Sequence, residues 1–110
     1  MITILLAAHY APISFAAELV YVEWKDCASC MRFNKQMARE YATSEIGKKI
    51  VLRRVNILGP WPADLKHVSR PPYTPVFILV DGGREVGRFN GYTSPQQFKH
   101  NLRRLMQRLN

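Results

Sequence analysis

Two cysteines, Cys27 and Cys30, are the residues of this sequence best suited to carry out chemistry. They are the only cysteines in the chain. An apolar run precedes them and a stretch typical of helix follows from Cys30, so the pair is expected at a strand-to-helix turn. Two thiols at this spacing can close a small disulfide, and the first N–H groups of a helix stabilise a thiolate. The pattern predicts a redox dithiol in which Cys27 is the nucleophile and Cys30 the resolving thiol.

Other uses of a cysteine pair fit the sequence less well. A structural zinc site needs four ligands, and the chain has neither a second cysteine pair nor two histidines at ligand spacing. A purely structural disulfide would close so short a loop that it adds little stability. A copper site stays open as an alternative, because Cu(I) accepts two thiolates and one distant histidine. We predict no metal site and no bound cofactor.

Charged neighbours act in opposite directions on the pKa of the Cys27 thiol. The carboxylate of Asp26 should raise this pKa and oppose the helix dipole, whereas Lys25 and Arg32 should lower it. The sequence leaves the sign of the net shift open.

Length and charge narrow the class of protein. A chain of 110 residues with 47% hydrophobic residues forms one domain with an ordinary core. Its net charge of +8 favours anionic partners or acidic protein surfaces. The basic residues are dispersed along the chain and no aromatic-rich RNA-binding motif lies between them, so nucleic acid is not the predicted partner.

The N-terminal segment, residues 1–17, contains no acidic residue, no Lys and no Arg. It includes an apolar run over residues 2–8, and Ser14-Phe15-Ala16 fits the small-x-small pattern that precedes a signal-peptidase cut. The apolar run is far shorter than the roughly 20 residues that cross a bilayer. We expect a signal peptide or N-terminal extension over 1–17, followed by the folded domain over 18–110. An N-terminal strand or tail of that domain is the alternative.

The first half of this domain has the pattern of a βαβ unit. Residues 19–22 form a near-continuous apolar run, typical of a strand buried on both faces and paired in parallel. A helix is predicted from Cys30 to about Ile46, with Gly47 as its stop. A second strand is predicted over residues 50–57.

The second half has the pattern of a hairpin followed by a helix. Pro75 leads into an apolar strand over 76–80, and Gly82-Gly83 supplies the turn into an antiparallel edge strand over 84–89. Alternation along that edge strand places Val86 on the opposite face from Phe89. Ser94 is the predicted N-cap of a final helix with an apolar stripe. The members of this stripe are Phe98, Leu102, Leu105, Met106 and Leu109.

The order of these elements resembles that of the thioredoxin superfamily. The resemblance covers Glu18 to the C-terminus, and it depends on the CxxC pair, the segment 73–77 around Thr74-Pro75, and the segment 86–92 ending in Gly-Tyr. It implies an α/β protein of thioredoxin-like fold, in which helices flank a central mixed sheet of about four strands.

The resemblance also implies roles for individual residues. Cys27 would be the attacking thiolate and Cys30 the resolving thiol. Pro75 would be a cis-proline facing the disulfide, and the backbone of Thr74 would bind a substrate strand. Thioredoxins have Gly-Pro between the cysteines and a buried acid at the position of Tyr21. The proton relay through that acid is therefore absent here, or is replaced by Glu23 or Asp26.

Within the superfamily the chain looks most like the SoxS-type thioredoxins of bacterial sulfur-oxidation clusters. This resemblance implies a monomeric periplasmic protein-disulfide reductase. Its substrate would be a cysteine of a sulfur-carrier protein, and its electrons would come from a membrane thiol transporter. A disulfide oxidase or isomerase, a thioredoxin-fold copper chaperone and a regulatory binding module are the alternatives.

Overall fold

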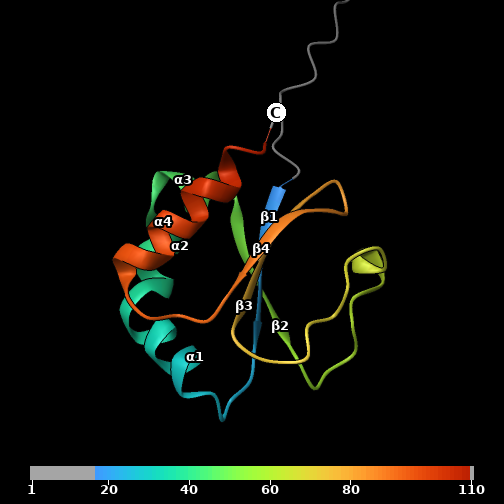
Figure 1. Ribbon diagram of the computed structural model, residues 1–110, viewed down its shortest axis with the longest axis horizontal. Helices are drawn as coiled ribbons and strands as arrows, with labels where there is room; N and C mark the ends of the chain where they lie inside the picture. The colour runs from blue at the N-terminus through green and yellow to red at the C-terminus, as the bar shows by residue number, and fades with distance from the viewer. Residues whose placement is uncertain (1–16, 110) are drawn as a thin grey trace, which may run out of the picture.

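The computed structural model describes residues 17–109, in which four strands form one mixed sheet of order β2-β1-β3-β4 (Figure 1). The expected signal peptide or extension at 1–17 lies outside the described residues, apart from Ala17. That residue opens strand β1 (Ala17–Glu23), where it is buried and pairs with Asp81.

The pairing of the strands confirms the predicted mixed sheet. β1 runs parallel to β2 (Val51–Asn56), and it runs antiparallel to β3 (Val76–Asp81). β3 pairs antiparallel with β4 (Arg84–Asn90), so β4 is an edge strand. The two central strands, β1 and β3, are buried on both faces, as their unbroken apolar sequences require.

All the α-helices lie on one face of the sheet (Figure 1). A helical run from Ala28 to Thr43 consists of α1 (Ala28–Phe33), a π-helical segment η1 (Asn34–Ala38) and α2 (Arg39–Thr43), and α3 (Glu45–Lys49) follows it. Helix α4 (Pro95–Met106) begins at Ser94, whose hydroxyl accepts a hydrogen bond from the Gln97 N–H at 3.2 Å. No helix among residues 17–109 has the length and apolar character that crossing a bilayer requires.

An aromatic cluster joins this helix layer to the sheet. Phe33 from α1, Phe77 from β3 and Phe98 from α4 lie with their ring centroids 4.8 to 5.2 Å apart. The predicted stripe of α4 faces this core, as Phe98, Leu102 and Leu105 are buried and Met106 and Leu109 pack against the cluster.

The opposite face of the sheet is covered by the loop between β2 and β3, which contains a 3₁₀ turn, η2 (Ala63–Leu65). Leu65 and Val68 are buried against Val20 and Ile78 of the sheet. The indole N–H of Trp61 donates to the carbonyl oxygens of Leu65 and Val68, at 2.9 and 3.0 Å.

The predicted helix stop at Gly47 is wrong. The helical run breaks at Ser44, whose extended backbone ends α2 and whose hydroxyl caps α3 by accepting the Gly47 N–H at 3.0 Å. Gly47 is buried inside α3, where an added Cβ would lie 1.8 Å from the Tyr41 carbonyl oxygen. A close approach of backbone to backbone explains this glycine, not a helix end.

The prediction that side chains simply alternate between the two faces of β4 is also wrong. The register shifts at the pair Leu79 and Val80, so that Gly87 pairs with Leu79 while Glu85 pairs with Val80. This bulge lets Val86 pack against the same core cluster as Phe89.

Candidate active site

Cys27 and Cys30 form a disulfide at the start of α1, with their Cα atoms 5.2 Å apart. Cys27 is the N-cap residue, in extended conformation, and its sulfur accepts a hydrogen bond from the Cys30 N–H at 3.1 Å. A backbone hydrogen bond from the Cys27 N–H to the Trp24 carbonyl closes the turn that leads from β1. The predicted strand-to-helix turn therefore places the Cys27 sulfur at the positive end of the helical run.

The two cysteines differ in exposure. Cys27 is 9% exposed, whereas Cys30 is 1% exposed. The hydroxyl of Tyr21, on β1, donates to the Cys30 carbonyl at 3.2 Å and holds that residue against the sheet. An approaching partner therefore meets Cys27 first.

Tyr21, where the resemblance to thioredoxins implied a buried acid, cannot act as such an acid at neutral pH. Desolvation by burial is the main cause that raises the pKa of its hydroxyl above the ordinary value, and the neighbouring Glu23 carboxylate raises it further. The side chain therefore stays protonated and acts as a hydrogen-bond donor. Glu23 forms an ion pair with Arg54 at 2.8 Å, and Asp26 is exposed to solvent.

Arg32, predicted only as a charge near Cys27, has a defined contact in the structure. Its Nη2 atom donates to the Ser29 hydroxyl and to the Tyr92 carbonyl, both at 3.1 Å. The Tyr92 hydroxyl in turn donates to Gln36 at 2.9 Å. These bonds fasten the loop after β4 to the helix that carries the cysteines. Tyr92 and Gln36 were missed as site residues, and only the Gly-Tyr pair at the end of β4 hinted at them.

Thr74 and Pro75 lie at the same end of the sheet as the cysteines. The peptide bond between them is cis, as the resemblance implied. Val76 pairs with Val22 on β1, so Pro75 follows this register opposite Glu23, four residues before Cys27. The Pro75 carbonyl accepts the Gly91 N–H at 2.8 Å. The backbone N–H and C=O of Thr74 have no hydrogen-bonding partner within residues 17–109.

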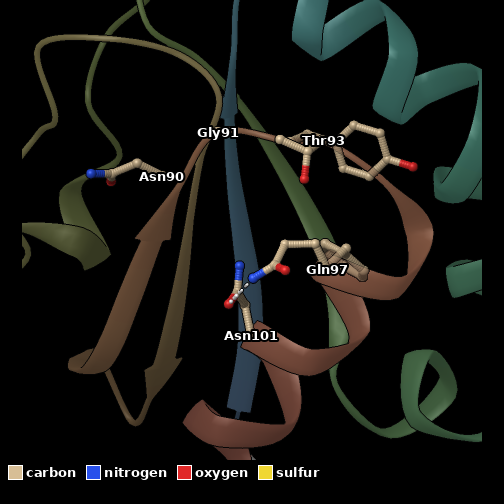
Figure 2. Close-up of a pocket in the computed structure, with 7 residues that line it drawn as sticks. Asn90, Gly91, Thr93, Gln97 and Asn101 are labelled. Atoms are coloured by element: carbon tan, nitrogen blue, oxygen red, sulfur yellow. Dashed lines mark hydrogen bonds between the residues drawn. The ribbon is translucent and has the colours of Figure 1, made fainter.

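A pocket of about 400 Å³ lies between the loop after β4 and helix α4 (Figure 2). In Figure 2 the side chains of Gln97 and Asn101 lie together on α4, joined by a hydrogen bond of 3.1 Å, below Gly91 and Thr93. The pocket lining contains three amides, two hydroxyls and two aromatic rings but no charged side chain. It can therefore accept the neutral polar backbone of a bound chain.

Two exposed apolar side chains adjoin the candidate site residues in sequence. Met31, one turn after Cys27, is 60% exposed, and Tyr73, two residues before Pro75, is 51% exposed.

Among residues 17–109 no three His, Cys, Asp or Glu side chains are grouped as they would be to hold a metal ion.

Comparison with solved structures shows that the fold is similar to that of thioredoxins. The structure is similar to the reduced form of the periplasmic thioredoxin SoxS from Paracoccus pantotrophus, with a TM-score of 0.80 and 28% sequence identity. The match covers 86% of this chain and 99% of that protein.

Two further thioredoxins share the fold. The thioredoxin of Fasciola hepatica has a TM-score of 0.57 at 19% identity, over 82% of both chains. The thioredoxin of Thermus thermophilus has a TM-score of 0.57 at 22% identity, over 81% of this chain and 72% of its own. No protein-family model matches the sequence, and no curated protein matches it either.

Proposed function

This chain belongs to the thioredoxin superfamily and is a thiol-disulfide oxidoreductase, and we propose that it works as an exported protein-disulfide reductase with Cys27 and Cys30 as its catalytic pair. Thr74 and Pro75 form the substrate-binding loop of this proposal. The reaction needs no bound cofactor, because the two thiols supply both electrons.

The reaction has two exchange steps. The Cys27 thiolate attacks one sulfur of a substrate disulfide, forms a mixed disulfide and releases the first substrate thiolate, which takes up a proton. The Cys30 thiolate then attacks the Cys27 sulfur, releases the second substrate thiol and forms the Cys27–Cys30 disulfide. The substrate gains two electrons, and the protein is left in the disulfide form that the structure contains.

The difference in exposure between the two cysteines supports the assignment of their roles. Cys27 is the more accessible residue and caps the helix, so its thiolate is stabilised by the Cys30 N–H and by the helix dipole. Cys30 is buried and held by Tyr21, so it can reach only a sulfur already bonded to Cys27. This is the order that a nucleophile and a resolving thiol require.

The open backbone of Thr74 supports the binding of an extended substrate segment. An unpaired N–H and C=O next to a strand can add hydrogen bonds to a partner chain. The exposed side chains of Met31, next to Cys30, and of Tyr73, next to Thr74, offer that segment apolar contacts.

The similarity to a periplasmic thioredoxin supports an exported location. The resemblance to SoxS-type thioredoxins implies a partner in sulfur oxidation. On this basis the substrate is a cysteine of a sulfur-carrier protein, a membrane thiol transporter is the electron donor, and the chain acts as a monomer. The alternatives use the same two cysteines. An oxidase would take two electrons from its substrate, and an isomerase would leave the number of electrons on the substrate unchanged.

Trapping of the mixed disulfide tests the proposal. In a native periplasmic extract, the Cys30→Ser variant should accumulate a partner linked to the Cys27 sulfur, and a reductant should release it. The Cys27→Ser variant is the matched control and should trap nothing. If Cys30→Ser yields no adduct that depends on Cys27, the reductase proposal loses its support. Reduction of insulin by the wild type, lost in Cys27→Ser, would show that the dithiol transfers electrons to a protein disulfide, and the reduction potential of the pair would distinguish a reductase from an oxidase.

A further inference from the structure

The net charge of this protein is concentrated on the helix layer. Residues 28–49 and 91–109, which contain α1 to α4, include nine Lys or Arg and two acidic residues, a net charge of +7. The remaining residues between 17 and 90 include seven basic and six acidic residues, a net charge of +1. Nearly all of the total of +8 therefore belongs to one of the two layers that cover the sheet.

The helices bring these charges onto a single surface. α1 to α4 lie on the same face of the sheet (Figure 1). The Lys99 ammonium of α4 contacts the Glu40 carboxylate of α2 at 3.0 Å, which places the two helices side by side. Lys35, Arg39 and Arg103 are exposed and have no ion-pair partner within residues 17–109. We call the outer side of α1 to α4 the helix-layer surface.

Elsewhere the acidic residues nearly balance the basic ones in number, and three arginines form ion pairs. Arg53 pairs with Asp64 at 2.6 Å and with Glu18 at 3.4 Å. Arg54 pairs with Glu23, and Arg88 pairs with Glu85. The contrast between the two sides gives the molecule an electric field that orients a charged partner as it approaches.

The helix-layer surface reaches the active site. Arg32 is part of it, lies two residues beyond Cys30 and is bonded to the loop that follows β4. A partner bound to this surface therefore extends to the Cys27 sulfur.

We propose that the helix-layer surface docks an acidic face of the redox partner protein and so presents the partner's disulfide to Cys27. This inference deepens the proposed reductase function and rests on it. Of the large apolar side chains exposed in the described part of the chain, only Met31 lies on a helix, so the surface has little to insert into a bilayer. Tyr41, Tyr92 and Phe98 of this layer are buried, which leaves no exposed Tyr, Phe or Trp ring there to stack on nucleic-acid bases.

Three synthetic peptides test the proposal with the reduced full chain. Each contains the same two-cysteine disulfide loop and a tail of about ten residues, which extends about 33 Å. The tails are rich in Asp, Ser or Lys. The rate constant for disulfide reduction is measured at ionic strengths of about 10 mM and about 150 mM, where the Debye lengths are about 30 and about 8 Å.

Two double variants separate the surface from the net charge. Lys35→Glu/Arg103→Glu alters the helix-layer surface, and Lys66→Glu/Arg84→Glu alters exposed positions outside it. Both lower the formal net charge from +8 to +4. Rates with the Ser-tailed peptide report on the integrity of the active site and of the fold.

We expect the wild type to reduce the Asp-tailed peptide about tenfold faster than the Ser-tailed peptide at low ionic strength. Most of this advantage should disappear at the higher ionic strength. Lys35→Glu/Arg103→Glu should lose the advantage, while Lys66→Glu/Arg84→Glu should keep most of it.

Equal losses in the two variants, or no preference for the Asp-tailed peptide, would overturn the docking surface. The same holds if phosphatidylglycerol vesicles or a single-stranded oligonucleotide bind the wild type more tightly than the Asp-tailed peptide does. If the wild type fails to reduce even the Ser-tailed peptide, the reductase function itself is wrong. Reduction of all three peptides at one rate leaves that function standing and removes only the docking surface.

Discussion

The hydroxyl of Tyr21, buried on the central strand β1, donates a hydrogen bond to the carbonyl oxygen of Cys30 at 3.2 Å. The same carbonyl accepts the N–H of Asn34 within the helical run. Tyr21 also stacks on Phe77, with ring centroids 5.0 Å apart, and meets Phe33 edge-on at 4.7 Å. One side chain therefore ties the first turn of the helical run that contains Cys30 to the centre of the sheet.

The variant Tyr21→Phe should keep the ring packing and lose this link. We expect a decrease of about 1 kcal/mol in the free energy of unfolding, measured by urea denaturation, because one buried hydrogen bond is removed. Amide hydrogens of α1 should exchange faster with solvent, since the first turn is no longer held to β1.

Tyr41→Phe is the matched control for this prediction. Its hydroxyl also donates to a buried backbone carbonyl, that of Ile50, remote from the cysteines. It should cost a similar free energy and leave exchange in α1 unchanged. Equal acceleration of α1 exchange in both variants would contradict a specific role for Tyr21.

A second prediction concerns Gly47. An alanine Cβ there would lie 1.8 Å from the Tyr41 carbonyl oxygen, and backbone cannot move aside as a flexible side chain can. We expect Gly47→Ala to lower the free energy of unfolding by about 3 kcal/mol. At Gly59 the nearest atom to an added Cβ is 3.4 Å away, so Gly59→Ala should change stability by no more than about 0.5 kcal/mol. Thermal denaturation of both variants would reveal the difference, and equal midpoints would contradict it.

Gly47 also shows which features of the fold could not be predicted from the sequence. The strands, the hairpin and the start of α4 follow from patterns within a few residues, and all were predicted. The break at Ser44 depends on the backbone of α3 approaching Tyr41, and a glycine that permits such an approach looks like a helix stop in the sequence. The bulge in β4 likewise depends on packing against α4 and not on alternation.

The site was predictable to the same degree. The cysteine pair and the Thr74-Pro75 segment are local motifs, so the sequence alone could propose them as site residues, and the structure shows the disulfide and the cis peptide bond there. The bond between Arg32 and Tyr92 joins residues 60 positions apart, and the Tyr21 contact joins two elements through a backbone atom. No local pattern encodes such long-range contacts, and they appear only after the chain has folded.

A third prediction concerns stability in acid. The guanidinium of Arg53 holds the pKa of the Asp64 carboxyl below its ordinary value, mainly through a hydrogen bond. A folded-state pKa below the unfolded value means that the unfolded chain binds more protons. This contribution is therefore present above the unfolded pKa, near 4, and is lost as pH falls through the folded pKa.

We expect Asp64→Asn to reduce the urea midpoint at about pH 7 but not at about pH 2, where the wild-type carboxyl is protonated as well. Asp81→Asn, at an exposed acid with no ion pair within residues 17–109, is the control and should have little effect at either pH. A cost for Asp64→Asn that is the same at both values of pH would contradict the ion pair with Arg53.

The last prediction concerns stability in alkali. Burial raises the pKa of the Tyr21 and Tyr41 hydroxyls above the ordinary value near 10. A folded-state pKa above the unfolded value stabilises the fold below the unfolded pKa, and this stability is lost as pH rises from there toward the folded pKa. In that range each buried tyrosine should lower the free energy of unfolding by about 1.4 kcal/mol per pH unit.

Tyr21→Phe/Tyr41→Phe should flatten this decline, while Tyr73→Phe, at an exposed tyrosine, should not. Urea midpoints measured from about pH 9 to about pH 11 test this prediction. Equal slopes of the midpoint against pH in the wild type and in both variants would contradict a role for the two buried tyrosines.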